Sequence, residues 1–283
     1  MPQELPSFDL VVATVGRSEE LERLLDSIVA QRYPHVRVFV VDQNEDGRLE
    51  SILSRQSPEI RHVRSQPGLS RARNVALEHL SADIVAFPDD DCVYPPGLLV
   101  HVAERFSEEP GLDGLTGRAV DDAGSSSASW RADAAQLTDE NLWNRAISFT
   151  IFLRRDVVRR VGAFDERLGL GSPDPWSSGE EIDYLIRAVR ASARIEYEPS
   201  LAVQHDVSVD DSRVAYRDGA SIGYLLRKHR YPARTVARML ARPLGGTIVS
   251  LGRLDRSRAV YHAVTWRGRV RGYRGASRSN SSR

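Results

Sequence analysis

The sequence predicts an α/β protein with a doubly wound, mostly parallel sheet flanked by helices, followed by a basic helical extension. Up to residue 92, short apolar runs that indicate buried strands alternate with segments whose apolar residues recur at helical spacing. Strands separated by helices pair in parallel and place the helices on both faces of the sheet. Polar residues directly follow several of these runs, at the strand ends where open α/β sheets bind ligands.

Four strands and three helices account for the first part of the chain. Ser18 is a suitable cap for the first helix, because the residues after it repeat their apolar positions every three or four residues. Pro67-Gly68 predicts a turn before the third helix. The predicted strands are 8–14, 36–41, 60–63 and the run that begins at Ile84, and the helices after the first are 49–53 and 70–80.

The pattern loosens after a predicted helix at 98–106. Residues 121–135 are rich in Asp, Ala and Ser, which is typical of a surface loop. A second loop, rich in Gly, Pro and Ser, runs from Gly169 to Gly179. The remaining predicted elements are a strand at 147–153, helices at 156–161 and 180–191, a strand at 194–197 and a short apolar run that ends at His205.

The composition is that of a globular protein. The chain has 283 residues, of which 41% are hydrophobic and 28% charged. Its single cysteine, Cys92, excludes a disulfide framework and fits a reducing compartment. Glu4 and Asp9 interrupt the N-terminal segment, so no signal-peptide pattern is visible, and no apolar run reaches the length of a membrane span. We therefore expect a cytoplasmic location.

The net charge of zero hides a strong asymmetry. Of the 39 basic residues 17 lie in residues 213–283, with only two of the 39 acidic residues, so this segment carries +15 and the rest of the chain −15. We expect a first domain at 1–212. Residues 213–283 then form two or three basic helices with a disordered end from about Ala276.

Three consecutive carboxylates, Asp89, Asp90 and Asp91, follow the fourth predicted strand. Like charges packed this densely repel one another and need a counter-ion at the end of a core strand. Mg²⁺ typically takes one or two carboxylates together with substrate phosphates. An acidic turn on a solvated edge is the alternative, and the segment by itself leaves both readings open.

Six short motifs stand at the predicted strand ends and helix starts. They are Val12-Ala13-Thr14-Val15-Gly16-Arg17, Val41-Asp42-Gln43-Asn44, Ala72-Arg73-Asn74, Asp89-Asp90-Asp91, Gly162-Ala163-Phe164-Asp165 and Gly179-Glu180-Glu181-Ile182-Asp183. In this order, over roughly residues 8–206, the chain resembles the family 2 glycosyltransferases. The resemblance implies a GT-A fold, a nucleotide-sugar donor, a divalent metal (Mg²⁺ or Mn²⁺) and inversion at the anomeric carbon. The domain at 1–212 would then be the glycosyltransferase domain, with a nucleotide-sugar half at 8–106 and an acceptor half at 107–212.

The resemblance also implies a role for each residue on the donor side. Thr14 and Arg17 would hold the nucleotide, with a helix cap and a surface arginine as the alternative. Asp42 would accept hydrogen bonds from the base or ribose, unless it is a plain turn residue. Arg73 would pair with Asp42 or approach the diphosphate, with Asn74 beside Arg73, and an ordinary polar helix face is the alternative for both. Asp89 would face the ribose and the metal, Asp91 would bind the metal directly, and Asp90 would lie behind these two.

On the acceptor side, the resemblance places the general base at Glu181, with Asp183 as the fallback. Inversion needs a base that deprotonates the acceptor hydroxyl as it attacks. Glu180 would contact the acceptor, although a carboxylate at a helix N-terminus is also favoured by the helix dipole. Trp176, in the loop before this helix, would stack on an acceptor sugar, a core tryptophan being the alternative. His205 would approach the metal or diphosphate, and a structural histidine is its alternative.

We therefore expect a metal-dependent, hexosyl-type inverting glycosyltransferase (EC 2.4 class) that acts on a glycan or lipid-linked saccharide acceptor in cell-surface polysaccharide synthesis. A sugar-phosphate nucleotidyltransferase is the first alternative, but only Gly16-Arg17 matches its glycine-rich signature. A nucleic-acid-binding protein that uses the arginine-rich segment is the second. Few aromatic residues accompany those arginines, so we expect no nucleic-acid partner. An anionic membrane surface at the inner face of the plasma membrane is the partner expected for residues 213–283, and packing of these helices on the acidic rest of the chain is the alternative.

Overall fold

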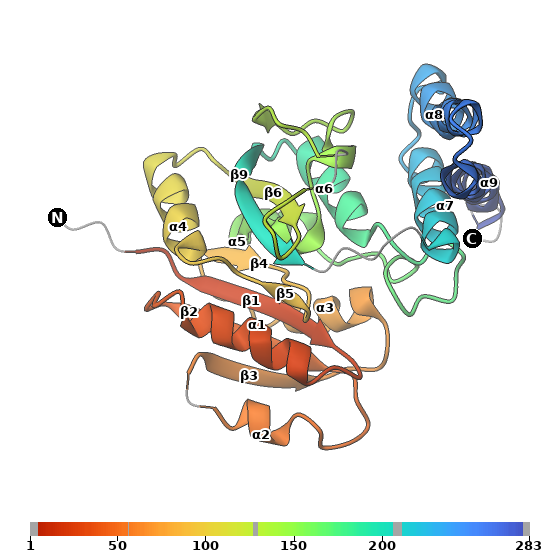
Figure 1. Ribbon diagram of the computed structural model, residues 1–283. Helices are drawn as coiled ribbons and strands as arrows, with labels where there is room; N and C mark the ends of the chain where they lie inside the picture. The colour runs from red at the N-terminus through yellow and green to blue at the C-terminus, as the bar shows by residue number, and fades with distance from the viewer. Residues whose placement is uncertain (1–4, 56, 127–129, 206–210, 280–283) are drawn as a thin grey trace. The chain divides into compact units, whose positions relative to one another are not determined.

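The computed structural model describes residues 5–55, 57–126, 130–205 and 211–279, and it divides the chain into two compact units (Figure 1). The N-terminal unit comprises residues 1–164 and 181–207, and the C-terminal unit comprises residues 165–180 and 208–283. The loop at 165–180 thus groups with the C-terminal helices, although nothing in its sequence indicates this. Each unit is described by itself.

The N-terminal unit is built on one sheet, which has nine strands in the described residues. Its strand order is β3-β2-β1-β4-β8-β6-β9-β5, with β7 paired to β9. Pairing is parallel throughout β3-β2-β1-β4, whereas β8 runs antiparallel to both of its neighbours. The strands are β1 (Phe8–Thr14), β2 (Val36–Asp42), β3 (Glu59–Arg64), β4 (Ile84–Ala86), β5 (Cys92–Val93), β6 (Gly114–Val120), β7 (Ala135–Gln136), β8 (Phe152–Arg154) and β9 (Ile195–His205).

Strand β1 shows why the sheet carries helices on both faces. All seven of its residues are buried, so neither face is left to solvent. Leu10 and Val12 pack in one core cluster with the apolar face of α1, which Figure 1 shows lying along β1 and β2, while α3 contacts the same two strands. The doubly wound α/β class is therefore confirmed. The helices of this unit are α1 (Glu19–Val29), α2 (Glu50–Leu53), α3 (Leu69–Leu77), α4 (Leu98–Glu108), α5 (Arg155–Val161), α6 (Glu180–Arg190) and two 3-10 turns, η1 (Leu142–Asn144) and η2 (Ser148–Thr150).

The second half of the sheet differs from the sequence prediction. Strand β6 lies where no strand is predicted, because glycines at 114 and 117 weaken the strand pattern. A Cβ at Gly117 would clash with the backbone carbonyl of Leu201 on β9, so the glycine permits close backbone approach. The two short runs expected near 194–197 and 203–205 form one continuous strand, β9. The strand expected at 147–153 begins instead with η2 and becomes β8 only at Phe152.

The C-terminal unit contains three helices, α7 (Ser212–Lys228), α8 (Ala233–Gly252) and α9 (Arg256–Ser279). Glycines let the backbones of α7 and α9 touch: a Cβ on Gly223 would clash with the carbonyl of Arg269, and one on Gly272 with that of Ala220. Helix α9 continues past Ala276, where the sequence predicts the start of disorder; residues 280–283 lie outside the described part. Among the described residues no helix combines the length and the apolar character needed to cross a bilayer.

The loop at 165–180 is tied to α7 at both ends. Near its start, Lys228 Nζ donates to Asp165 Oδ2 at 2.6 Å. Near its end, the Ser178 hydroxyl donates to Asp218 Oδ1 at 2.9 Å. Within the loop, Arg167 Nε pairs with Asp174 at 3.0 Å. These contacts explain why the loop belongs to the C-terminal unit.

Candidate active site

The parallel half of the sheet brings several predicted site residues to one edge. Thr14 and Asp42 are the last residues of β1 and β2, and they lie opposite each other in the parallel register. Strand β4 pairs with β1 in parallel and ends three residues before Asp89. Because carboxyl ends of parallel strands meet at one edge, this edge is the ligand-binding side of such a sheet.

Two side chains hold Asp89. Arg73, on α3, donates from Nη2 to Asp89 Oδ1 at 3.0 Å. The hydroxyl of Ser148, on η2, lies 3.1 and 3.0 Å from the two Asp89 oxygens. Arg73 is only 1% exposed, and its guanidinium lies over the rings of Phe87 and Phe164. The sequence offered Asp42 or a diphosphate as the partner of Arg73, whereas the described ion pair is with Asp89.

Arg17 bridges the other two carboxylates. Its Nη1 donates to Asp90 Oδ1 at 2.8 Å and to Asp91 Oδ2 at 2.5 Å. His205 Nε2 lies 3.1 Å from the second oxygen of Asp91, and the imidazole stacks on Phe149 with ring centroids 4.6 Å apart. The pairing of β5 with β9 fixes this arrangement, because Cys92 and His205 are opposite each other in the register.

The pKa values of Asp90 and Asp91 are shifted in opposite directions. Burial raises the pKa of Asp90, and the hydrogen bonds from Thr14 and Arg17 only partly offset this. Burial also acts to raise the pKa of Asp91, but the hydrogen bond and charge of His205, helped by Arg17, outweigh it and lower the pKa. The surroundings therefore favour the ionised form of Asp91 more than that of Asp90.

Asp42 is buried in a polar setting. Its Oδ1 accepts bonds from the backbone and side-chain amides of Asn44 at 2.9 and 2.8 Å. Its Oδ2 lies 3.1 Å from His62 Nε2 and 3.4 Å from Arg64 Nη1, both on β3. Burial acts to raise the Asp42 pKa, but these hydrogen bonds and the Arg64 charge lower it overall.

Asn74 joins α3 to a distant segment. Its Oδ1 accepts a hydrogen bond from the backbone N–H of Phe164 at 2.7 Å, and its Nδ2 donates to the Phe164 carbonyl at 3.0 Å. Both polar atoms of the amide are therefore used within the protein. The nucleotide-sugar role expected for Asn74 stays a prediction, and the structure adds a positioning role for the Gly162–Phe164 turn.

The three carboxylates at the start of α6 differ in burial. Asp183 is 0% exposed and pairs with Arg187 at 3.0 Å, one helical turn on. Arg187 also donates to the carbonyl of Val161 at 2.8 Å, which fixes the pair against α5. Glu180 is also buried, at 5% exposed, whereas Glu181 is only partly buried. Of the three, Glu181 is the one that a substrate can reach from solvent.

Trp176 lies in the C-terminal unit and is 5% exposed. It stacks on Tyr224 of α7 with ring centroids 4.8 Å apart, and the guanidinium of Arg167 lies over it. Little of the indole surface is left for a sugar ring. The acceptor role expected for Trp176 stays a prediction, and the observed role of its ring is to pack the loop onto α7.

The residues expected to hold a metal have suitable donor atoms. Asp89 and Asp91 offer carboxylate oxygens, which Mg²⁺ and Mn²⁺ prefer, and His205 offers an imidazole nitrogen, which Mn²⁺ accepts. Asp91 and His205 are already adjacent. Across the described residues, no three or more His, Cys, Asp and Glu side chains are preassembled as a metal cluster. The chemistry of these donor atoms, rather than a preassembled cluster, is what fits a divalent cation.

Three residues of the site escape sequence reasoning. Ser148 is 59 positions from Asp89, and it is an ordinary residue of a predicted strand, so no local pattern connects the two. His62 and Arg64 carry a weak signal, because His62 lies in the predicted strand at 60–63 and Arg64 directly follows it, two positions further along the chain. Once the parallel pairing of β2 with β3 is known, both side chains can be placed next to Asp42.

Comparison with known proteins supplies an independent finding. The family model for glycosyl transferase family 2 matches residues 9–162, more than half of the chain. A glycosyltransferase, AglE, of Haloferax volcanii is 28% identical over 222 residues, which cover 73% of this chain and 67% of that protein. The succinoglycan biosynthesis protein ExoM of Rhizobium meliloti is 25% identical and covers 87% of this chain and 79% of its own. The chain spans only 42% of a similar pre-mycofactocin glycosyltransferase of Mycobacterium tuberculosis.

Solved structures share the fold. A mannosyltransferase, PcManGT of Pyrobaculum calidifontis, solved with GDP-Man and Mn²⁺, superposes with a TM-score of 0.67 at 16% identity and covers 96% of this chain and 88% of its own. TarS of S. aureus, residues 1–349, gives a TM-score of 0.60 at 18% identity, covering 92% and 90%. The GT-A fold expected from the sequence is confirmed by these likenesses.

Proposed function

The chain belongs to glycosyl transferase family 2, and we propose that it transfers a sugar from a nucleoside diphosphate donor to a hydroxyl group of a glycan or lipid-linked saccharide, with inversion at the anomeric carbon. Family membership favours this activity over the nucleotidyltransferase and nucleic-acid-binding alternatives. The solved structures that share its fold include complexes named for GDP-Man, UDP and UDP-GlcNAc, which supports a nucleotide-sugar donor.

One observation carries the proposal: Thr14, Asp42 and the three aspartates gather at the carboxyl edge of the parallel strands, inside the segment that matches the family. In this role Asp42 accepts hydrogen bonds from the base or ribose. Arg73 keeps Asp89 in place through a buried ion pair. Arg17 balances the charge of Asp90 and Asp91, and in this proposal it contacts a phosphate of the donor.

A divalent cation, held by Asp91 and Asp89 with His205, would neutralise negative charge on the departing nucleoside diphosphate. Support comes from the donor chemistry of these side chains and from the Mn²⁺ named in the mannosyltransferase complex. Asp91 and His205 also interact with other side chains of the protein. Asp91 is held ionised by His205 and Arg17, and His205 is oriented by its stack on Phe149.

Glu181 is the proposed general base, which takes the proton from the acceptor hydroxyl. A base must touch a substrate that arrives from solvent, and Glu181 is the partly exposed carboxylate at the start of α6. Asp183 is fully buried and paired with Arg187, so we assign it to positioning the first turn of the helix. Glu180 remains the proposed acceptor contact.

A donor screen tests the proposed function. Incubated with Mg²⁺ or Mn²⁺, the chain should release nucleoside diphosphate from one of a panel of UDP- and GDP-sugars, faster with a suitable acceptor than by slow hydrolysis alone. Chelation of the metal should abolish the release, because the leaving group then departs without charge compensation. Ion-pair chromatography of the nucleotide products measures the result. Release of pyrophosphate instead would indicate nucleotidyl transfer and contradict the proposal.

We also propose that the C-terminal unit meets an anionic membrane surface. Six of the eleven large apolar residues that are exposed in the described chain lie at 244–260, at the end of α8, the start of α9 and the turn between them. Ile248 is 71% exposed and Leu254 is 89% exposed. Exposed arginines at 242, 253, 256 and 258 accompany them. Apolar side chains flanked by cations suit an anionic lipid interface, at about 1 kcal/mol for each basic residue near the surface.

Flotation with phosphatidylglycerol vesicles tests this surface. At low salt the chain should rise with anionic vesicles, stay behind with neutral ones, and be released as salt screens the arginines. Ile248→Ser combined with Leu254→Ser should lower the floating fraction several-fold, because two insertable side chains are lost. Val29→Ser with Val100→Ser, exposed apolar positions of the N-terminal unit, is the matched control. A full chain that ignores anionic vesicles at low salt contradicts the proposal.

A further inference from the structure

Arg17 is the most exposed side chain of the ion pairs that join it to Asp90 and Asp91. Its guanidinium side chain is 46% exposed, whereas the side chains of Asp90 and Asp91 are 9% and 17% exposed. The main chain at this point is fixed, because the hydroxyl of Thr14 donates to the Arg17 carbonyl at 3.3 Å. A rearrangement of these charges therefore involves the long side chain of Arg17 rather than its backbone or the buried carboxylates.

The other residues proposed to hold the cation are fixed by second contacts. Asp89 is bonded to both Arg73 and Ser148. His205 stacks on Phe149, with the two rings parallel to within 1°. Ser148 and Phe149 are consecutive residues of η2, so one turn of the chain orients Asp89 and His205 together.

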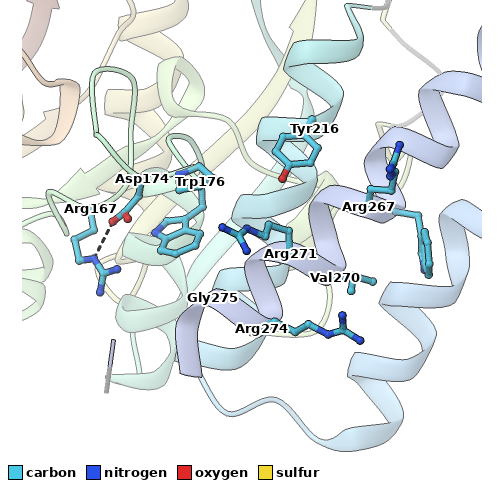
Figure 2. Close-up of a pocket in the computed structure, with 11 residues that line it drawn as sticks. Arg167, Asp174, Trp176, Tyr216, Arg267, Val270, Arg271, Arg274 and Gly275 are labelled. Atoms are coloured by element: carbon cyan, nitrogen blue, oxygen red, sulfur yellow. Dashed lines mark hydrogen bonds and ion pairs between the residues drawn. The ribbon is translucent and has the colours of Figure 1, made fainter. Parts of the chain in front are cut away.

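Arg17 lacks the aromatic contacts that hold other paired arginines. Figure 2 shows the contrasting case of Arg167 in the C-terminal unit, which is bonded to Asp174. The guanidinium of Arg167 also lies over the rings of Trp176 and Tyr224. Among the described residues no ring lies over the Arg17 guanidinium, and its side chain donates only to Asp90 and Asp91.

Arg17 and a divalent cation need the same carboxylate. Asp91 is a proposed ligand of the cation, and its Oδ2 lies 2.5 Å from Arg17 Nη1 while its Oδ1 lies 3.1 Å from His205 Nε2. A guanidinium and a divalent cation on one carboxylate repel each other strongly at such short distances. The bond from Arg17 to Asp90 Oδ1, at 2.8 Å, is not subject to this competition, because Asp90 is not a proposed ligand of the cation.

We propose that the divalent cation displaces Arg17 from Asp91, and that the guanidinium, still bonded to Asp90, turns to the diphosphate of the donor. The inference rests on the proposed function, from which it takes the cation and the donor. Arg17 then neutralises the carboxylates before the cation binds and contacts phosphate oxygens afterwards. The cation alone has to break the Arg17–Asp91 pair, whereas a cation that binds with a diphosphate provides the guanidinium with a new partner.

Electron paramagnetic resonance of free Mn²⁺, recorded without nucleotide, tests the exchange without requiring turnover. Arg17→Gln should bind Mn²⁺ at least about threefold more tightly than the unmodified chain, because the competing ion pair is gone. The same variant should bind UDP or GDP in the presence of Mn²⁺ at least about threefold more weakly, because a charged hydrogen bond to phosphate is lost. A merely structural role of Arg17 does not change the two affinities in opposite directions, and unfolding does not tighten binding.

Arg64→Gln is the matched control for charge. Arg64 lies at the same edge of the sheet and is 52% exposed, but it faces Asp42 instead of Asp91. The substitution removes the same charge, and at physiological salt it should change the Mn²⁺ affinity by less than about twofold, because charges out of contact are screened. Equal tightening in both variants overturns the exchange, since general electrostatics then explains the result. An Mn²⁺ affinity that Arg17→Gln leaves unchanged also overturns it.

The same measurements separate the exchange from the proposed function. A chain that releases nucleoside diphosphate from a sugar donor, but whose Arg17→Gln variant binds Mn²⁺ no more tightly, keeps the glycosyltransferase proposal and loses only the exchange. Tighter Mn²⁺ binding by Arg17→Gln in a chain that releases no nucleotide from any UDP- or GDP-sugar supports the competition at Asp91 and contradicts the transfer activity. A chain that binds no Mn²⁺ with or without nucleotide overturns the exchange together with the proposed cation site.

Discussion

Glu181→Gln is expected to lower sugar transfer by about 100-fold or more while leaving donor binding intact. The amide preserves size and hydrogen bonding but cannot accept the proton of the acceptor hydroxyl, and a general base typically contributes this much or more. The effect should fall on kcat, because the base acts as the bond forms rather than when the donor binds. Steady-state kinetics of transfer, together with calorimetry of the nucleoside diphosphate, measure both quantities.

The neighbouring carboxylates provide the controls. Asp183→Asn breaks a buried ion pair with Arg187, so it should lower the melting temperature, whereas Glu181→Gln should leave it unchanged. Activity lost in Asp183→Asn without any loss of stability, beside an active Glu181→Gln variant, would show that Asp183 is the base. Donor hydrolysis by water offers a second readout, since it can continue in a variant that no longer activates the acceptor.

Asp91→Asn should abolish the metal-dependent part of nucleoside diphosphate binding, with a loss of affinity of tenfold or more when Mn²⁺ is present. Asp91 is the carboxylate whose pKa is lowered, and it lies against both His205 and Arg17. Replacing it removes one charged oxygen ligand of the cation and the negative charge that faces Arg17 and His205. Calorimetry with and without Mn²⁺ separates the metal-dependent and metal-independent affinities.

Asp46→Asn is the matched control for this variant, because Asp46 is exposed and pairs only with Arg48 among the described ion pairs. It should change neither affinity. Circular dichroism of both variants checks that the fold is retained. Metal-dependent affinity that survives in Asp91→Asn removes this residue from the cation site and leaves its pairing with Arg17 and His205 as a structural feature.

The parallel half of the fold follows from the sequence because its signals are local. The residues of β1 form one continuous apolar run, whereas the apolar residues of α1 recur every three or four positions. These two patterns predict a strand followed by a helix. The other half depends on contacts distant in sequence. Strand β6 is hidden by Gly117, whose role appears only when its neighbour β9 is in place. The packing of α7 on α9 is hidden for the same reason, since glycines rather than apolar side chains make the contact.

The residues of the candidate site fall into the same two groups, those with a local sequence signal and those that depend on contacts distant in sequence. The aspartates at the end of β4 and the acids at the start of α6 are visible as residue types at predicted element ends. Their partners are not: Ser148 reaches Asp89 from η2, and His205 reaches Asp91 because β5 pairs with β9. Asn74 shows the opposite case, where a motif residue bonds to the backbone of Phe164. Side-chain partners depend on register and on tertiary packing, which composition and periodicity do not encode.

The ties between the loop at 165–180 and α7 have a thermodynamic consequence. A free loop of this length loses about 1–2 kcal/mol of conformational entropy for each residue that a ligand orders. Here Lys228 and Asp218 of α7 fix the loop near its two ends. The ion pair between Arg167 and Asp174 divides the loop between these ends into shorter segments. The ordering is therefore completed when the chain folds. A ligand that contacts this loop meets a preorganised surface, so most of its contact energy can appear as affinity.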